Sequence, residues 1–347
     1  MKYFFFLLSL IVCLFVSAQD LALADSIVKY QMASGGWLKN QDWLRGADQA
    51  YMAACRLTGV GSTIDNGATT YELGVLAQTV AEMQSSAIYD LKASEPYRLA
   101  FLRGIKYLLA MQYDNGGWPQ FWPLRSAESY SNHITFNDNA MVRVMRLLKD
   151  VAENKPPYDL LGVKGALRKH CGAAFRRGLR CILDCQIRRA DGRPTVWCQQ
   201  HDEVTLAPAS ARKYELAAYC GHGETVDILQ LLMDCYAEQP SDTLGFRIAC
   251  AVEWLESHAI HGVKLESFTN AEGQPDKRLV SDPEAPDVWA RYYDLETEEP
   301  LFSDRHGLPL KDFNAISYER RNGYSWLGDS PRRVIERWKK VKVNSEK

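Results

Sequence analysis

The sequence predicts an all-α protein in which paired helices form an α/α barrel or toroid, with long irregular loops and a few short strands at the barrel mouth. Apolar residues recur at helical spacing from Ala24 to about Leu255. Strand-like alternation is scarce over the same stretch, which favours a helical class. A weak repeat returns after roughly 75–80 residues and leaves room for two helices between its copies, as in a ring of helical hairpins.

The N-terminus reads "MKYFFFLLSLIVCLFVSAQD", with one lysine, a run of apolar residues and a small-residue ending. This pattern is typical of a secretory signal peptide over residues 1–19, cleaved near Ala18 or Gln19. The apolar run is shorter than the ~20 residues that a membrane span needs. We therefore expect a secreted or periplasmic protein, with no membrane contact in its mature form, and a single domain over residues 20–347.

Composition limits the partners. The chain has 41 Lys and Arg against 43 Asp and Glu, and its net charge of −2 gives no sign of a polybasic face for nucleic acid. We expect a monomer.

Export permits disulfides among the eight cysteines after the leader, but buried free thiols fit equally well. Cys181 and Cys185 lack a matching His or Cys pair, so no zinc site is predicted.

Helical segments follow in order along the chain. Helices are predicted over residues 71–84, 97–113, 140–154, 167–186 and 225–236. After Leu255 the sequence becomes rich in Pro, Gly, Asp and aromatic residues. We expect loops and short strands there that wrap the barrel mouth, and one helix after "GDSP".

The repeat consists of "YQMASGGWLKN" (30–40), "MQYDNGGWPQF" (111–121) and a looser copy, "CQIRRADGRPTVW" (185–197). Each has a Gln-containing turn, a Gly-bearing loop and then a Trp. Glycine suits the left-handed end of a helix, which costs other residues about 1 kcal/mol. A ring built this way gathers its polar loops at one end, where a long substrate fits.

Two helices are expected to begin at unusually polar stretches, "STIDNGATT" (62–70) and "SYSNHITFNDNAM" (129–141). One Asn or Asp is enough to cap a helix, so most of these side chains are surplus. Carboxylate and amide oxygens are the ligands that Ca2+ prefers. Asp65 and Asp138 are therefore candidate calcium ligands, with plain helix capping as the alternative.

Two further stretches carry candidate binding residues. In "NGGWPQFWPLRS" (115–126), Trp118 is a candidate for stacking on a sugar ring, with burial in the core as the alternative. In residues 194–224, a Ser-His-Asp site using Ser210 and His201 is not favoured, because the G-x-S-x-G turn of such enzymes is absent.

Arginines and aromatic residues alternate in "DVWARYYDLETEEPLFSDRHG" (287–307) and "SYERRNGYSW" (317–326). Arginine binds carboxylates through two parallel hydrogen bonds, so such a row suits an acidic sugar polymer. Structural pairs with Asp or Glu are the alternative. The candidates are Arg291, Arg305, Arg320 and Arg321.

Six motifs occur together and in order: "TIDNGATT", "NGGWPQFWP", "HITFNDNAM", "TVWCQQHD", "WARYYDLET" and "YERRNGYSWLG". With them the chain resembles the pectate lyases of polysaccharide lyase family 10, over about residues 24–335. The resemblance implies one catalytic (α/α)3 barrel that cleaves α-1,4-polygalacturonate with calcium. The implied reaction is an anti β-elimination that releases 4,5-unsaturated oligogalacturonates.

The resemblance also implies roles for single residues. Asp65 and Asp138 would flank calcium and the galacturonate at the scissile bond, and Arg212 of "ASAR" would be the Brønsted base. A guanidinium normally stays protonated, so such a base needs calcium and a second cation nearby to lower its pKa. Asn139 stands where some members have Asp. Arg291 and Arg305 would hold substrate carboxylates, and further substrate contacts are expected from Asn66, Trp118, Arg320 and Arg321.

Two other functions remain open at this point. A glycoside hydrolase on the same barrel would use a pair such as Asp65 and Asp138 as acid and base. A non-catalytic pectin-binding protein would keep the arginines and aromatic residues without turnover.

Overall fold

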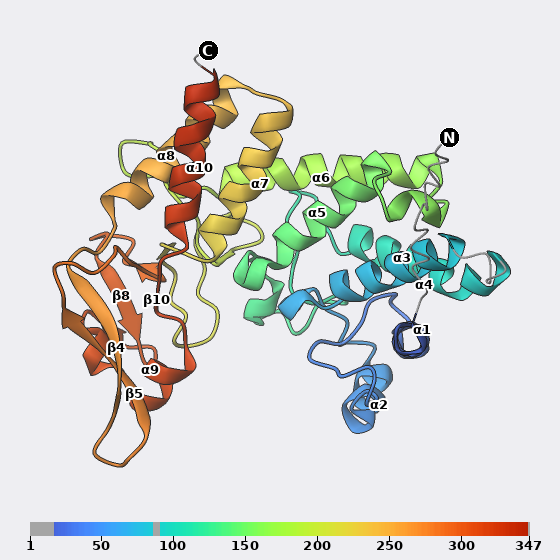
Figure 1. Cartoon of the computed structure of the whole chain (residues 1–347), viewed down its shortest axis with the longest axis horizontal. Helices are drawn as coiled ribbons and strands as arrows, with labels where there is room; N and C mark the ends of the chain where they lie inside the picture. Colours follow the sequence, from blue (N-terminus) through green and yellow to red (C-terminus); the bar gives the residue numbers. More distant parts are fainter. Residues whose placement is uncertain (1–16, 86–90, 346–347) are drawn as a thin grey trace, which may run out of the picture.

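The computed structural model describes residues 17–85 and 91–345 (Figure 1). Most of the predicted signal peptide therefore lies outside the described residues. No helix in the described part of the chain is both long enough and apolar enough to cross a membrane.

Helices dominate the chain up to Ser257, which confirms the predicted fold class. All five helices predicted from periodicity are present, as α3 to α7. The helices are α1 (Ala18–Tyr30), α2 (Gln49–Thr58), α3 (Thr70–Ser85), α4 (Glu95–Ala110), α5 (Ala140–Glu153), α6 (Gly165–Cys185), α7 (Glu224–Glu238) and α8 (Asp242–Ser257).

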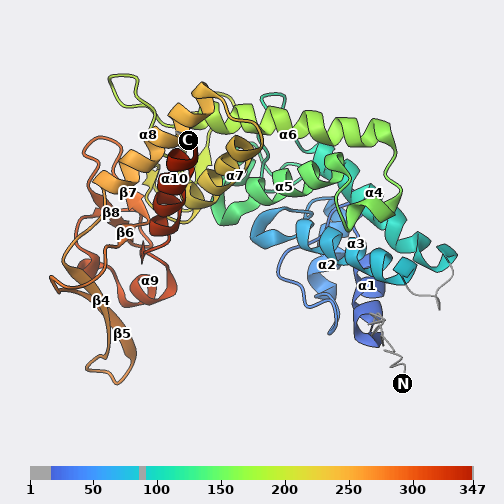
Figure 2. The same ribbon diagram turned by 45° about the horizontal axis from the view of Figure 1, so that its top comes forward.

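The helices are arranged in two layers that follow one another along an arc (Figures 1 and 2). Helices α1, α4 and α6 pack in sequence in one layer, and α3, α5 and α7 in the other. The pairs α3 and α4, α5 and α6, and α7 and α8 join the layers. Because α1 and α8 lie at opposite ends of the arc in both views, the toroid is open and not the closed barrel that the sequence predicted.

The tryptophans of the repeat form its buried framework. Each indole N–H donates to a backbone carbonyl of the preceding helix, so each Trp ties a loop to one helix of the same layer. A fourth copy, which lacks the Gln and Gly signals, was not predicted. The pairs are Trp37 with Ile27 (2.8 Å), Trp118 with Leu108 (2.8 Å), Trp197 with Ile182 (2.7 Å) and Trp289 with Leu255 (2.7 Å).

This framework corrects one predicted site residue. Trp118 has no exposed surface, because its ring packs in the core and its indole N–H is already bonded. It is therefore not available to stack on a sugar. Gly178 of α6 lies against the ring, and a Cβ at this position would be only 2.8 Å from Cζ3 of Trp118.

The glutamines of the repeat join neighbouring helices of one layer. Each amide group donates both to its own loop and to a carbonyl of the next helix, which is 61 to 69 residues away. Gly35 and Gly116 adopt left-handed backbone angles in these loops, and a Cβ on either would meet a carbonyl oxygen at 2.7 Å or less. The bonds to the next helix are Gln31 to Ala100 (2.9 Å), Gln112 to Ala174 (2.9 Å) and Gln186 to Arg247 (3.0 Å).

The chain after Ser257 forms the predicted loops and short strands and the predicted final helix, together with one further helix. Helix α10 (Pro331–Ser345) begins just after "GDS" and packs on α7 and α8. The hairpin of β4 (Val263–Thr269) and β5 (Pro275–Ser281) is longer than expected, with seven residues in each strand. Helix α9 (Tyr318–Gly323) was not predicted.

Short strands connect this region to the helices. A four-stranded sheet has the order β3, β7, β8, β9, so the segment before α7 pairs with the C-terminal region. The strands are β1 (Ile134–Thr135), β2 (Gln200–His201), β3 (Tyr219–Cys220), β6 (Trp289–Ala290), β7 (Tyr292–Tyr293), β8 (Pro300–Ser303), β9 (Pro309–Leu310) and β10 (Leu327–Gly328). β1 pairs with β2, and β6 with β10.

The cysteines in the described residues are all unpaired thiols, and all but Cys235 are fully buried. Of the two alternatives left open by the sequence, the structure thus has free thiols and no disulfide in this part of the chain.

Candidate active site

The two polar helix starts lie side by side. Each is a single 3-10 turn, η1 (Asp65–Gly67) before α3 and η4 (Asn137–Asn139) before α5, and the two turns pack against each other. The backbone is left-handed at Asn66, Asp138 and Asn139, a conformation that Asn and Asp tolerate best after glycine. Asp138 accepts no backbone N–H bond, and Asn139, the N-cap of α5, makes no side-chain cap bond. Capping therefore does not account for these side chains.

The two carboxylates of these turns have different surroundings. Asp65 is buried, forms an ion pair with Lys39 and accepts the Asn66 N–H at 3.1 Å. Asp138 is exposed, and one of its oxygens accepts the side-chain amide of Asn137 at 2.8 Å. The negative charge of Asp65 is thus already balanced, and that of Asp138 is open to solvent. Lys39 was not predicted, although it stands two residues after a repeat Trp, as Arg291 does in the fourth copy.

A second acidic group lies at the other end of the β1 and β2 pair. His133, Asp202 and Glu203 bring ligand-type atoms within 4.8 Å of one another. The Nδ1 atom of His133 lies 2.8 Å from a Glu203 oxygen. A site with imidazole and carboxylates is a possible metal site, but its nitrogen suits transition metals better than calcium.

Arg212 lies at the centre of a cluster of arginines and tyrosines. Its Nε donates to Glu215 Oε2 at 2.7 Å, and its Nη2 bonds the other oxygen of the same carboxylate. The Arg212 side chain is 46% exposed, whereas Glu215 is buried. The hydroxyl of Tyr324 donates to Glu215 at 3.0 Å. Burial lowers the pKa of Arg212, but the bonds to Glu215 outweigh it and hold the pKa above its ordinary value.

Two more arginines share the ring of Tyr214 with Arg212. The guanidinium carbons of Arg320, Arg212 and Arg305 lie 4.7, 5.0 and 5.7 Å from its centre. Arg305 and Arg320 both bind the carboxylate of Glu319, at 2.7 and 2.6 Å. The predicted base and two of the predicted substrate-binding arginines are thus brought together.

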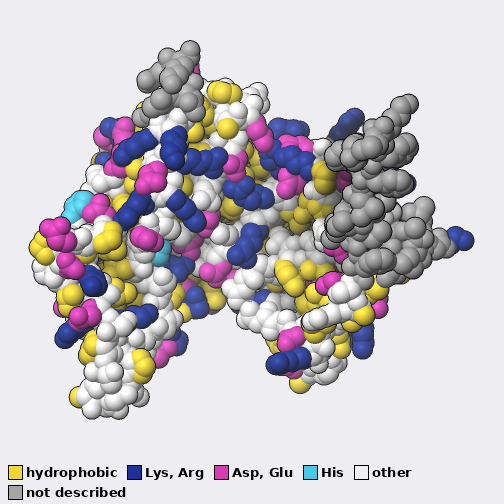
Figure 3. Space-filling view, in the orientation of Figure 1, with side chains coloured by type: hydrophobic (Ala, Val, Ile, Leu, Met, Phe, Trp, Pro, Cys, Tyr) yellow, Lys and Arg dark blue, Asp and Glu magenta, His cyan; other side chains and the backbone are white. Residues whose placement is uncertain are grey.

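Arg291 connects this cluster to the carboxylate turns. It forms a buried ion pair with Glu224, and its Nη2 lies 3.4 Å from Asn137 Oδ1. Its guanidinium also lies 4.9 Å from the ring centre of Tyr324. The residues predicted from both halves of the chain therefore belong to one continuous region. Figure 3 shows the molecule hollowed between the C-terminal strands and the N-terminal helices, with Lys and Arg side chains above and beside the hollow.

Two other candidates have structural roles. Arg321 binds Asp276 through two nitrogens, at 2.9 and 2.6 Å, and gives its remaining donor to backbone carbonyls. It therefore holds α9 to β5, and its role in substrate binding stays a prediction. His201 is fully buried and bonded on both ring nitrogens, and burial lowers its pKa to about 4. It is not placed to activate a serine.

Comparisons with known proteins identify the family of the chain. The sequence profile of a family described as pectic acid lyase matches residues 31–335. A family 10 polysaccharide lyase from Cellvibrio cellulosa has a similar structure, with a TM-score of 0.76 and 31% identity over 92% of each chain. A mutant of such an enzyme from that organism, solved with trigalacturonic acid, aligns with the same values. No curated protein matches the chain.

A profile match over most of the chain, together with this identity to a solved enzyme, makes the protein a polysaccharide lyase. Within that class, the chain belongs to the pectic acid lyases of polysaccharide lyase family 10. The resemblance found in the sequence is thereby confirmed.

Proposed function

We propose that the protein cleaves α-1,4-polygalacturonate by calcium-assisted anti β-elimination. A base removes the proton from C5 of a galacturonate, the electron pair forms the C4=C5 double bond, and the bond from C4 to the glycosidic oxygen breaks. The leaving oxygen takes up a proton. The products are a new chain end and a 4,5-unsaturated oligogalacturonate.

The observation that carries this proposal is the contact between the arginine cluster and the carboxylate turns through Arg291. The C5 proton becomes acidic only when the adjacent substrate carboxylate is neutralised, and fixed cations supply that neutralisation. Arg291, Arg305 and Arg320 are the cations that would bind carboxylates of the polymer. The complex of a similar enzyme with trigalacturonic acid supports an acidic galacturonate chain as the ligand.

Calcium is the cofactor that the family resemblance implies, and the carboxylate turns fit it. Asp138 offers an exposed carboxylate with no cationic partner among the described residues, and Asp65 offers a second one. Bound calcium would supply positive charge beside the substrate carboxylate. Because Lys39 holds Asp65, we expect Asp65 to join such a site only when the lysine moves aside.

Arg212 is our candidate for the base. Its half-exposed guanidinium shares the ring of Tyr214 with Arg305 and Arg320, and their repulsion favours loss of a proton. The pair with Glu215 acts in the opposite direction and keeps the resting side chain charged. We therefore expect turnover to rise toward alkaline pH.

We also infer that residues 1–19 are removed on export. Ser17 caps α1 together with Asp20, and cleavage near Ala18 or Gln19 would remove this cap. The buried face of α1 would remain. N-terminal sequencing of the protein from the culture medium or periplasm tests the cleavage.

One assay tests the function. The purified enzyme is mixed with polygalacturonate, and ultraviolet absorbance of the conjugated product is followed with calcium or with a chelator. We expect absorbance to rise with calcium, to stop with chelator and to return when calcium is added back. Reducing ends without absorbance would instead identify a hydrolase, and retention on polygalacturonate without any turnover would identify a binding protein.

A further inference from the structure

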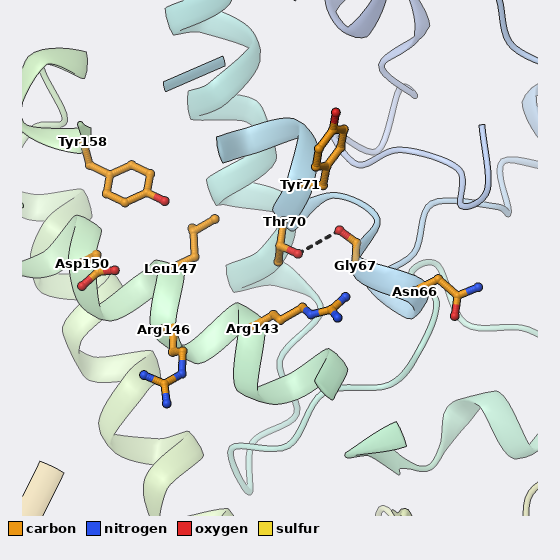
Figure 4. Close-up of a pocket in the computed structure, with 9 residues that line it drawn as sticks. All are labelled: Asn66, Gly67, Thr70, Tyr71, Arg143, Arg146, Leu147, Asp150 and Tyr158. Atoms are coloured by element: carbon orange, nitrogen blue, oxygen red, sulfur yellow. Dashed lines mark hydrogen bonds between the residues drawn. The ribbon is translucent and has the colours of Figure 1, made fainter. Parts of the chain in front are cut away.

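A pocket beside the carboxylate turns contains an arginine that the reaction described above does not use. The pocket has a volume of about 470 Å³ and lies between the start of α3 and the outer side of α5 (Figure 4). Asn66 and Gly67 form its wall nearest the candidate active site, and Tyr158 lies at its far end.

Arg143 is the cation of this pocket that forms no ion pair within the described residues, although the carboxylate of Asp227 on α7 is close enough to feel its charge. It is exposed, and within the described residues it has neither an ion pair nor a hydrogen bond. The other charged side chains of the pocket have partners, because Arg146 binds Asp234 at 2.6 Å and Asp150 lies 3.4 Å from Lys155. The pocket therefore favours an anionic ligand at Arg143.

The backbone next to Arg143 is shaped to admit its guanidinium. Gly67 has φ +78°, and a Cβ there would lie 2.4 Å from Arg143 Nη1. Any other residue at this position would push the guanidinium away, besides straining the turn. Gly67 belongs to the same turn as Asp65, so Arg143 lies against the turn that carries a candidate calcium ligand.

The pocket also presents an aromatic ring and a hydroxyl. Tyr71 is 56% exposed, an unusual exposure for a large ring, and Figure 4 shows it above Thr70 at the edge of the pocket. Thr70 donates to the Gly67 carbonyl at 2.9 Å. A cation for a carboxylate beside a ring face for a pyranose is the combination that a uronic acid unit requires.

We infer that this pocket is an additional subsite that holds one uronate unit of the polymer, with its carboxylate on Arg143 and its sugar ring against Tyr71. The inference rests on the proposed function, because it assumes that the polymer lies across the adjacent carboxylate turns. It makes the enzyme selective for longer chains, since only these reach from the scissile bond into the pocket.

Kinetics on oligogalacturonates of defined length test the subsite. We expect Arg143→Gln to raise KM for hexagalacturonate and polygalacturonate about tenfold, because a charge-assisted bond is lost. Both kcat and the KM for trigalacturonate should stay unchanged. Tyr71→Ala should produce the same length-dependent change, and Arg56→Gln, at an exposed arginine of α2, should have no effect.

Direct binding separates this inference from the proposed function. Calorimetry in an Arg212→Ala background compares binding of tri- and hexagalacturonate with and without Arg143→Gln. Weaker binding of the hexamer alone supports the subsite, even if the wild type produces no unsaturated product and the proposed reaction is wrong. Equal binding by both proteins, or an equal loss for trimer and hexamer, would overturn the subsite.

Discussion

The arginine side and the carboxylate side of the site are built in opposite ways. On the arginine side, Arg212, Arg291 and Arg320 each bind a glutamate of the protein. On the carboxylate side, Asp138 is exposed, and among the described residues it is hydrogen-bonded only to the side-chain amide of Asn137. The arginines are therefore fixed in position by internal counter-charges before any ligand arrives.

This difference indicates how the two sides contribute. A preorganised cation stabilises developing negative charge without a cost in reorganisation during the reaction. An open carboxylate does not have this advantage, but it is free to accept a metal ion as a ligand. The arginine side thus fits the role of stabilising the substrate anion, and the carboxylate side fits the role of binding an ion.

The largest effect is expected when the candidate base on the arginine side is removed. We expect Arg212→Ala to lower kcat by about a thousandfold, the range for loss of a general base, with little change in KM. Arg212→Lys keeps the positive charge and should restore only a small part of the rate. Ultraviolet assays of both variants beside Arg56→Ala provide the measurement. A near-normal rate in Arg212→Ala would remove the residue from the chemical step.

A second test separates a base from a fixed cation at the same position. Glu215 raises the pKa of Arg212, so Glu215→Gln removes the negative charge and should lower that pKa. If Arg212 is the base, the deprotonated form then appears at lower pH. We expect the rising limb of the kcat profile to move toward neutral pH. The amide oxygen still accepts one of the Arg212 hydrogen bonds, and the other is lost because the NH2 group is a donor.

The two roles give opposite results in this test. A residue that acts only as a cation works best when protonated, so Glu215→Gln would leave the rising limb in place. Stopped-flow or steady-state profiles of kcat against pH for wild type and variant decide between them, with Glu319→Gln, at the carboxylate that binds Arg305 and Arg320, as the matched control.

The carboxylate side is tested through calcium. We expect Asp138→Ala to raise the half-saturating calcium concentration about tenfold, since one oxygen ligand with full charge is lost. His133→Ala should leave it unchanged, because that imidazole belongs to the separate acidic group. A calcium shift in His133→Ala without one in Asp138→Ala would place the ion beside Glu203 instead.

Sequence reasoning predicted the helices and two polar turns, which carry Asp65 and Asp138 and lie side by side, because both depend on local patterns repeated along the chain. It also predicted most of the arginine cluster, through resemblance. It was wrong for Trp118, although the equivalent Trp37 and Trp197 in the repeat were a signal of a structural role. A residue that recurs in every copy holds the copies together more often than it binds a ligand at one of them.

Other features depend on contacts that no local pattern encodes. Arg320 and Arg321 are neighbours in sequence, but on α9 adjacent side chains point about 100° apart. Arg320 therefore lies over the ring of Tyr214, and Arg321 binds Asp276. Likewise, Lys39 and Asp65 form an ion pair although they are 26 residues apart in the sequence. Closure of a helical ring depends on contacts between its first and last helices, which are still farther apart in the sequence.

The smallest effect is expected at Lys39, which forms an ion pair with the buried carboxylate of Asp65. Asp65 thus has an internal counter-charge, as the arginines of the arginine side do. Lys39→Met keeps the length of the side chain but removes its charge, which leaves Asp65 without its ion-pair partner. We expect the half-saturating calcium concentration to fall about threefold, the scale of a partly exposed ion pair. Lys106→Met, at an exposed lysine of α4, is the matched control and should not change it. Unchanged calcium dependence in Lys39→Met would show that Asp65 is not a ligand, and that the carboxylate side consists of Asp138 and its neighbouring amides.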